Sequence, residues 1–133
     1  MKYFLDTNVI IDALKDKTES LRKHFEKINS TDIYIPSIVI AELEYGALHS
    51  NNYERNKSLY ELFIKEFAVI PFDRQCCESY GRIRQKLSEK GLLIGSNDML
   101  IAATSLAYSA ILVTHNVREF SRIDGLSVED WLE

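Results

Sequence analysis

The feature that most constrains the fold of this chain is a regular alternation of short apolar runs with longer stretches of helical spacing. The short runs predict strands at residues 3–5, 33–35, 68–70 and 110–113, with a weaker fifth strand at 127–129. The longer stretches predict helices over residues 8–14, 19–28, 36–48, 52–66, 73–90 and 96–108, and a short turn or helix around 119–120. Strands that alternate with helices form a parallel sheet covered on both faces. We therefore expect an α/β fold with a central parallel sheet of 4–5 strands flanked by helices.

The overall composition predicts one domain over residues 1–133. The length is usual for a single domain, and no Pro/Gly/Ser-rich linker, repeat or low-complexity tract divides the chain. The 16 basic and 20 acidic residues give a net charge of −4. This balance argues against a protein held to nucleic acid by bulk positive charge. It is compatible with an enzyme whose metal ions offset its own acids.

Three features favour a cytoplasmic location. Cys76 and Cys77 are adjacent, and neighbouring cysteines rarely bridge, so we expect reduced thiols in a reducing compartment. The N-terminus carries no apolar region of signal-peptide length. The most apolar span, residues 99–113, is interrupted by polar residues, and it is shorter than the ~20 residues of a membrane helix.

Two acidic residues lie next to predicted strands. Asp6 follows the first strand directly. It either caps the next helix, as Asp commonly does, or belongs to a site. Glu119 comes soon after the fourth strand and, taken alone, is typical of a surface acid. Thr114 and Asn116 end that strand with short polar side chains that could brace an acid or reach a metal.

Two further acids lie on predicted helices. Glu42 shares its helical face with apolar or small residues. That is unusual because burying an unpaired charge is costly, although a place at the rim of the core or beside a lysine would also explain it. Glu44, two positions on, is expected to face solvent. Asp98 opens a helix that is apolar on almost every side, where Ser96 or Asn97 could already serve as the cap.

The positions of these four acids predict that they meet at one edge of the sheet. They follow strands or lie near the starts of helices, and in a parallel sheet these points share the carboxyl edge, where ligands collect. Two carboxylates ~4 Å apart repel by ~4 kcal/mol at an effective dielectric near ~20. Converging acids therefore take up protons or hold hard cations. Oxygen ligands without a histidine or thiolate set indicate Mg²⁺ or Mn²⁺.

The segments that carry these residues resemble the PIN-domain ribonucleases, and more narrowly the VapC toxins of bacterial VapBC toxin–antitoxin pairs. The similar segments are LDTNVIID, AELEYGAL, IGSNDMLIAA, VTHNVREF and GLSVEDW, in the family's order over nearly the whole chain. The family's acidic quartet falls on Asp6, Glu42, Asp98 and Glu119, and its auxiliary polar positions fall on Thr7, Asn8, Thr114 and Asn116. The chain departs from the pattern at Ser96, often proline, and at Glu119, often aspartate.

The resemblance implies an endoribonuclease that arrests translation until a VapB-like antitoxin blocks its site. The enteric VapC group, which this chain most resembles, cuts the anticodon stem-loop of initiator tRNA. Asp6, Glu42 and Asp98 would hold one or two Mg²⁺ or Mn²⁺ ions. Whether Asp98 or Glu119 orients the attacking water stays open at this point.

Basic and apolar residues outside the acid set suggest partner surfaces. Candidate RNA phosphate contacts are Lys15, Lys17, Arg82, Arg84, Lys86 and Arg118, and solvated helix faces are the alternative. Apolar residues in excess of one core are expected to form a homodimer surface or an antitoxin groove; these are Val9, Ile10, Leu14, Leu43, Tyr45 and Leu48.

Two rival functions fit the same sheet. A Mg²⁺-dependent phosphatase or phospho-receiver needs a nucleophilic aspartate with a close acidic neighbour and usually a late lysine. Here Asp6 is followed by Thr-Asn-Val and Thr114 by His-Asn. A non-catalytic RNA- or protein-binding module would bind without turnover, which the intact acid set disfavours.

Overall fold

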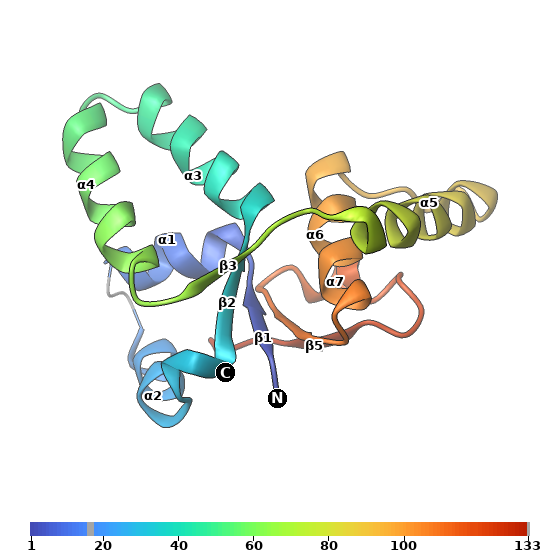
Figure 1. Cartoon of the computed structure of the whole chain (residues 1–133), viewed down its shortest axis with the longest axis horizontal. Coiled ribbons are helices and arrows are strands. Elements are labelled where there is room, and N and C mark those ends of the chain that lie inside the picture. The colour runs from blue at the N-terminus through green and yellow to red at the C-terminus, as the bar shows by residue number, and fades with distance from the viewer. Residues whose placement is uncertain (16–17, 133) are drawn as a thin grey trace.

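A five-stranded parallel sheet forms the centre of the computed structural model, which describes residues 1–15 and 18–132 (Figure 1). The order across the sheet is β3-β2-β1-β4-β5, and all four neighbouring pairs are parallel. The strands are β1 (Tyr3–Leu5), β2 (Ile33–Pro36), β3 (Ala68–Ile70), β4 (Ile111–Val113) and β5 (Ser127–Glu129). The predicted α/β fold is confirmed, including the weak fifth strand.

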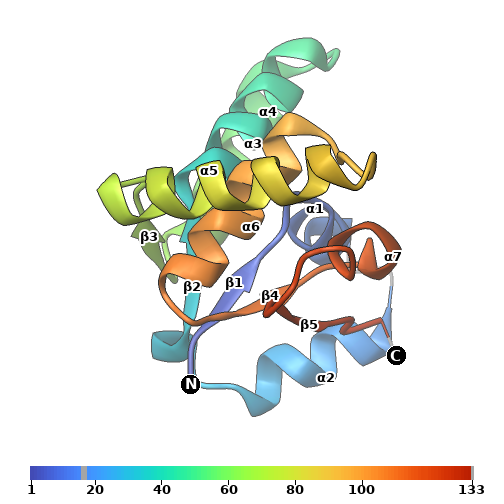
Figure 2. The same cartoon turned by 90° about the vertical axis from the view of Figure 1, so that its right-hand side faces the viewer.

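The helices cover the two faces of this sheet, as the order of the strands requires. They are α1 (Thr7–Lys15), α2 (Glu19–Lys27), α3 (Ser37–His49), α4 (Tyr53–Ile64), α5 (Arg74–Glu89), α6 (Ser96–Ala107) and α7 (Val117–Phe120). From β1 the chain moves outward to β2 and β3, then crosses back to β4 on the other side of β1. Right-handed crossovers in opposite directions place their helices on opposite faces. Accordingly α1 and α4 lie on one side of the strands, and α5 and α6 on the other (Figures 1 and 2).

The carboxyl edge of β1 is therefore the point where the winding of the sheet reverses. β1 pairs with β2 on one side and with β4 on the other. Crevices outside the carboxyl ends of strands at such a reversal are the usual ligand sites of open α/β sheets. Asp6 follows β1 at this point, and Thr114 follows β4 beside it.

The core consists of the inner strands and the helix faces that pack on them. Phe4, Leu5, Ile35 and Leu112 are fully buried, as expected for parallel strands covered on both faces. For three of the residues predicted to form a partner surface, the prediction is wrong. Val9, Ile10 and Leu43 are buried in the core, because α1 and α3 pack against each other and against the sheet.

A glycine turn sets the start of α6. Gly91 has a φ of 67°, and its N–H bonds to the carbonyl of Ser88 while that of Leu92 bonds to Leu87. This is the Schellman arrangement that ends a helix at a left-handed residue. It turns the chain from α5 towards Gly95, the residue that precedes α6. Gly95 is the N-cap residue of α6, so Ser96 and Asn97 are not. The first turn of α6 carries Asp98.

Two predictions about the character of the chain can be compared with the described residues. Cys76 is buried and Cys77 exposed, and both are free thiols, as predicted. None of the described helices combines the length and the apolar character that a membrane crossing requires.

Candidate active site

Asp6 lies at the centre of the carboxyl edge and is almost fully buried. Its Oδ1 accepts the N–H of Thr7 at 2.8 Å, and its Oδ2 accepts the hydroxyl of Thr114 at 2.7 Å. Burial raises the pKa of Asp6, and these two hydrogen bonds oppose that rise. Asp6 therefore contacts the first amide of α1 and also forms part of a polar cluster. That Asp6 belongs to a functional site stays a prediction.

Glu42 faces Asp6 from α3 through a shared threonine. The hydroxyl of Thr7 donates to Glu42 Oε1 at 2.5 Å, and Asn97 Nδ2 lies 3.4 Å from Glu42 Oε2. The charge of Glu42 raises the pKa of Asp6. The side chain also borders a cavity of about 700 Å³ whose lining includes Ile38, Tyr45 and Asn97. Glu42 is thus half-buried beside open space.

Asp98 links all four acids electrostatically. Burial and, in decreasing order, the charges on Asp6, Glu42 and Glu119 together raise its pKa to about 6. Its Oδ2 lies over Gly95, where an added Cβ would be 3.6 Å away. The charges of the other three predicted acids therefore all act on Asp98, and that of Glu42 acts on Asp6 as well.

The donor chemistry of this edge fits a hard divalent cation. Four carboxylates supply oxygen ligands only, the set that Mg²⁺ and Mn²⁺ prefer. Within the described residues, no three acidic, histidine or cysteine side chains lie in positions that could hold a metal ion together as they stand. The two oxygens of Glu42 are instead in contact with Thr7 and Asn97. Burial, and to a lesser extent neighbouring negative charge, raise the pKa values of Asp6 and Asp98, and a bound cation would favour their charged forms.

The predicted polar residues differ in what they contact. Thr114 is fully buried and donates to Asp6, and its own Oγ1 accepts the N–H of Asn116 at 3.0 Å. Asn116 thus braces the site through its backbone. Thr7 joins Asp6 to Glu42, whereas Asn8 is exposed on the first turn of α1.

The predicted RNA contacts fall into different groups. Arg82 and Lys86 line one cavity of about 880 Å³ beside α5, together with Lys90 and Arg122. Arg84 instead donates to the hydroxyl of Tyr80 at 2.8 Å. Lys15 and Arg118 are exposed on α1 and α7, and Lys17 lies outside the described residues.

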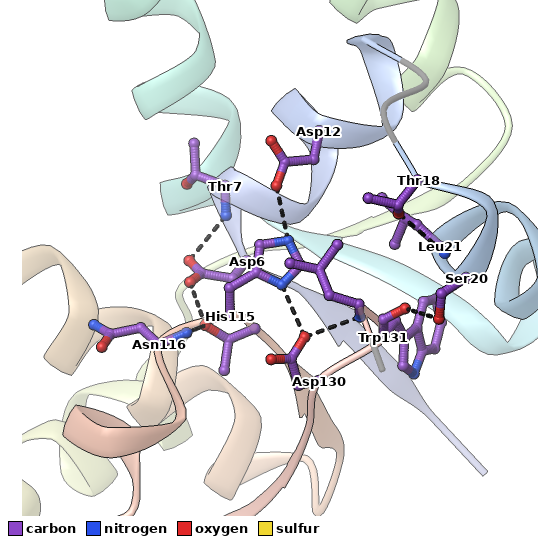
Figure 3. A network of polar contacts seen from close by, with 12 residues as sticks. Asp6, Thr7, Asp12, Thr18, Ser20, Leu21, His115, Asn116, Asp130 and Trp131 are labelled. Atoms are coloured by element: carbon purple, nitrogen blue, oxygen red, sulfur yellow. Dashed lines mark hydrogen bonds and ion pairs between the residues drawn. The ribbon is translucent and has the colours of Figure 1, made fainter.

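One polar cluster next to the site was missed from sequence. His115 Nε2 lies 3.0 Å from Asp12 Oδ2, and its Nδ1 lies 3.0 Å from Asp130 Oδ1 (Figure 3). Asp12 is half-buried in this cluster. Because α1, the loop after β4 and the end of the chain meet only in three dimensions, spacing could not reveal it. The sequence THN, in which a histidine separates two site residues, was the available signal.

Glu44 also differs from expectation. It was predicted to face solvent, but α4 covers it and supplies three donors: Tyr53 and Lys57, each at 2.7 Å, and the hydroxyl of Tyr60. Lys57 and the two tyrosines hold the pKa of Glu44 at about 2. Glu44 is thus a structural carboxylate that joins α3 to α4.

Comparison with known proteins agrees with this geometry. The family model of the PIN domain matches residues 3–126. Ribonuclease VapC2 of Rickettsia felis is 41% identical over 132 residues, covering 98% of each chain. The tRNA(fMet)-specific endonuclease VapC of Salmonella typhimurium is 40% identical over 131 residues, again covering 98% of each. The crystal structure of DNA-bound VapBC from Salmonella typhimurium superposes with a TM-score of 0.93 at 40% identity, covering 98% of both chains.

A sheet of this order with an acidic carboxyl edge defines a nuclease-like α/β domain. The chain belongs to the PIN-domain family and, within it, to the VapC ribonucleases. PIN-domain nucleases generally depend on divalent metal ions, and this dependence agrees with the donor set described above. The family assignment favours the ribonuclease over the phosphatase and the non-catalytic binding module.

Proposed function

We propose that this protein is the toxin of a VapBC-type pair, an endoribonuclease that hydrolyses RNA phosphodiesters and inhibits translation. The observation that carries the proposal is the acidic carboxyl edge of the sheet, where the charges of Asp6, Glu42 and Glu119 act on Asp98. Its support is the similarity to VapC ribonucleases over almost the whole chain. Residues 1–133 act as one domain in the cytoplasm.

Asp6, Glu42 and Asp98 hold one or two Mg²⁺ or Mn²⁺ ions in this proposal, and Glu119 completes the catalytic acids. The bound metal supplies activation of water and charge stabilisation at phosphorus. Burial and the neighbouring acids raise the pKa of Asp98 to about 6 in the metal-free protein, and a bound cation would hold it as the charged carboxylate. Thr114 and Thr7 keep the carboxylates of Asp6 and Glu42 oriented towards the ligand.

The substrate we propose is initiator tRNA, cut in its anticodon stem-loop. The name of the Salmonella typhimurium relative supports this choice. The cavity beside α5 offers a path for RNA phosphates, because Arg82, Lys86 and Lys90 recur every fourth residue on one helix face with Arg122 opposite. Two of the acids at this cavity are already engaged: Asp124 with Lys90 at 3.7 Å, and Glu89 with Gln85 at 2.7 Å.

A VapB-like antitoxin and a second copy of the chain are the proposed protein partners. The exposed apolar residues on α3 and α4 supply the surface, since Tyr45, Leu48 and Leu62 are each more than half exposed. Large apolar side chains left in solvent commonly mark interaction sites. Contact with operator DNA is indirect, through the antitoxin.

The test is incubation of the purified protein with total tRNA in Mg²⁺, followed by sequencing of the new RNA ends. The proposal expects ends within the anticodon stem-loop of initiator tRNA, lost on chelation and restored by added Mg²⁺ or Mn²⁺. Asp6→Asn should abolish them and leave the circular dichroism spectrum unchanged. Cleavage by Asp6→Asn at the wild-type rate would refute the proposed function. Labelling of Asp6 by a reactive phosphodonor would instead favour the phospho-receiver.

A further inference from the structure

His115 lies beside the acidic edge, with a carboxylate at each ring nitrogen (Figure 3). We propose that Asp12, His115 and Asp130 form a clamp that positions Thr114, and through it Asp6, for catalysis. These three are positioning residues, because their contacts are with one another and not with the reacting atoms. The inference rests on the proposed function of Asp6.

The clamp adds α1 to a pairing that already exists: β4 pairs with β5, and the N–H of Thr114 bonds to the carbonyl of Glu129 at 3.0 Å, whereas no strand pairing joins α1 to either segment. Asp12 lies on α1, His115 in the loop after β4, and Asp130 directly after β5. The side chains are 27%, 17% and 21% exposed, so the contacts are shielded from much of the solvent. Nδ1 makes a hydrogen-bond contact with Asp130 at 3.0 Å, whereas Nε2 is buried, lies 3.0 Å from Asp12 and has no hydrogen-bond partner among the described residues. The ring of His115 is therefore held between α1 and the chain end.

The neighbours of His115 carry the effect to the site. Thr114 and Asn116 flank it in sequence, and the N–H of Asn116 bonds to Thr114 Oγ1. That same Oγ1 donates its proton to Asp6 Oδ2 at 2.7 Å. Fixing the ring of His115 thus fixes the two peptide units that aim the Thr114 hydroxyl at Asp6.

The outer side of the clamp is anchored in the core. Asp130 Oδ1 also accepts the N–H of Leu132 at 2.9 Å. Trp131 is fully buried and its ring stacks on His24, so its position does not depend on the hydrogen bond that its carbonyl accepts from the hydroxyl of Ser20 at 2.9 Å. The end of the chain is therefore a rigid support for His115, which gives the final segment a function at the active site.

The test compares His115→Gln with Ser20→Ala. Glutamine keeps a polar side chain but is uncharged and cannot span both carboxylates. Loss of an outer partner of a metal ligand typically costs about 10–100-fold in activity or metal affinity. His115→Gln should therefore lower kcat and the calorimetric affinity for Mn²⁺ by about 10–100-fold, with the KM for RNA unchanged. Ser20→Ala removes a hydrogen bond from the same chain end, without touching His115, and should keep wild-type kcat and Mn²⁺ affinity.

A double-mutant cycle with Asp130→Asn separates positioning from folding. If Asp130 acts through His115, the double variant should lose no more kcat than His115→Gln alone, because coupled residues are not additive. Asp130→Asn keeps the size of the side chain and serves as the test if His115→Gln does not fold. Wild-type kcat and Mn²⁺ affinity in His115→Gln or in Asp130→Asn would overturn the clamp, and so would an equal loss in Ser20→Ala.

Asp6→Asn on the same RNA separates the two proposals. An inactive Asp6→Asn beside a fully active His115→Gln removes the clamp alone, whereas an active Asp6→Asn removes the proposed function.

Discussion

Glu42 and Glu44 are two residues apart on α3, yet their surroundings are opposite in electrostatic character. Glu44 receives three donors from α4, including the ammonium of Lys57, and its pKa falls to about 2. Glu42 faces Asp6 and Asp98, two carboxyl groups whose pKa values are raised by burial and by neighbouring charge. The charge of Glu44 is thus compensated by side chains of the protein itself. The charge around Glu42 is left for a ligand to compensate.

This difference distinguishes a structural carboxylate from a functional one. Folding alone favours pairing a carboxylate with cations and donors, as at Glu44. An uncompensated group of acids reduces stability, and perturbed groups of this kind cluster at functional sites. The predictions below are ways to break or sharpen this contrast.

The largest expected difference is in catalysis. Glu42→Gln should lower RNA cleavage by about 100-fold or more, because it removes a charge proposed to hold the metal. Glu44→Gln should leave the cleavage rate close to wild type, because Glu44 contacts α4 only. Initial rates on initiator tRNA at matched protein and Mg²⁺ measure both. Similar losses in the two variants would remove the contrast.

A smaller effect is expected where RNA phosphates are proposed to bind. The double change Arg82→Gln and Lys86→Gln should weaken RNA binding and make its dependence on log salt concentration shallower by roughly 1.4–1.8 units, since each lost phosphate contact removes about 0.7–0.9. The matched control is Lys23→Gln with Lys27→Gln, also four residues apart, on α2 near the amino end of the sheet. Binding measured by fluorescence anisotropy across salt should separate the pairs. An unchanged slope in the α5 variant would exclude this cavity as the RNA path.

Asp98 and Glu44 should change the stability of the protein with pH in opposite directions, and Asp98 should reduce it as pH rises. Its pKa is raised from 3.8 to about 6, so its favourable contribution is complete below pH 3.8 and is lost as pH rises through about 6. Asp98→Asn should therefore stabilise the metal-free protein relative to wild type above pH 6 and have little effect near pH 4. Thermal unfolding in chelator at both pH values tests this. Equal effects at the two pH values would contradict the proposed repulsion among the acids.

At Glu44 the sign is reversed. Its pKa is lowered from 4.5 to about 2, so its contribution is present above pH 4.5 and is lost as pH falls through about 2. Glu44→Gln should destabilise the protein at neutral pH, and the difference from wild type should shrink in acid. Because the group is partly exposed, we expect a modest shift in the urea midpoint. A Glu44→Gln protein as stable as wild type at neutral pH would show that the three donors add nothing.

The sequence predicted the elements well because their signals are local. Residues 52–66 were predicted as a helix, and α4 covers Tyr53–Ile64. The four acids were predicted from sequence to share one edge, since parallel topology places the ends of strands there, and their role in catalysis stays a prediction. What the sequence missed depends on which helix covers which face. Glu44 does point away from Glu42, as spacing requires, but α4 occupies that side. Asp12 and Asp130 were missed because their common partner, His115, is distant from both in sequence.

The central claim is that the acidic edge of the sheet holds a divalent cation through Asp6. Calorimetric titration of the metal-free protein with Mn²⁺ at pH 7 tests it most directly, using wild type, Asp6→Asn and Glu44→Gln. The account predicts saturable binding by wild type and by Glu44→Gln, and loss of binding by Asp6→Asn in a protein that keeps its circular dichroism spectrum. Mn²⁺ binding by Asp6→Asn with wild-type affinity would contradict it.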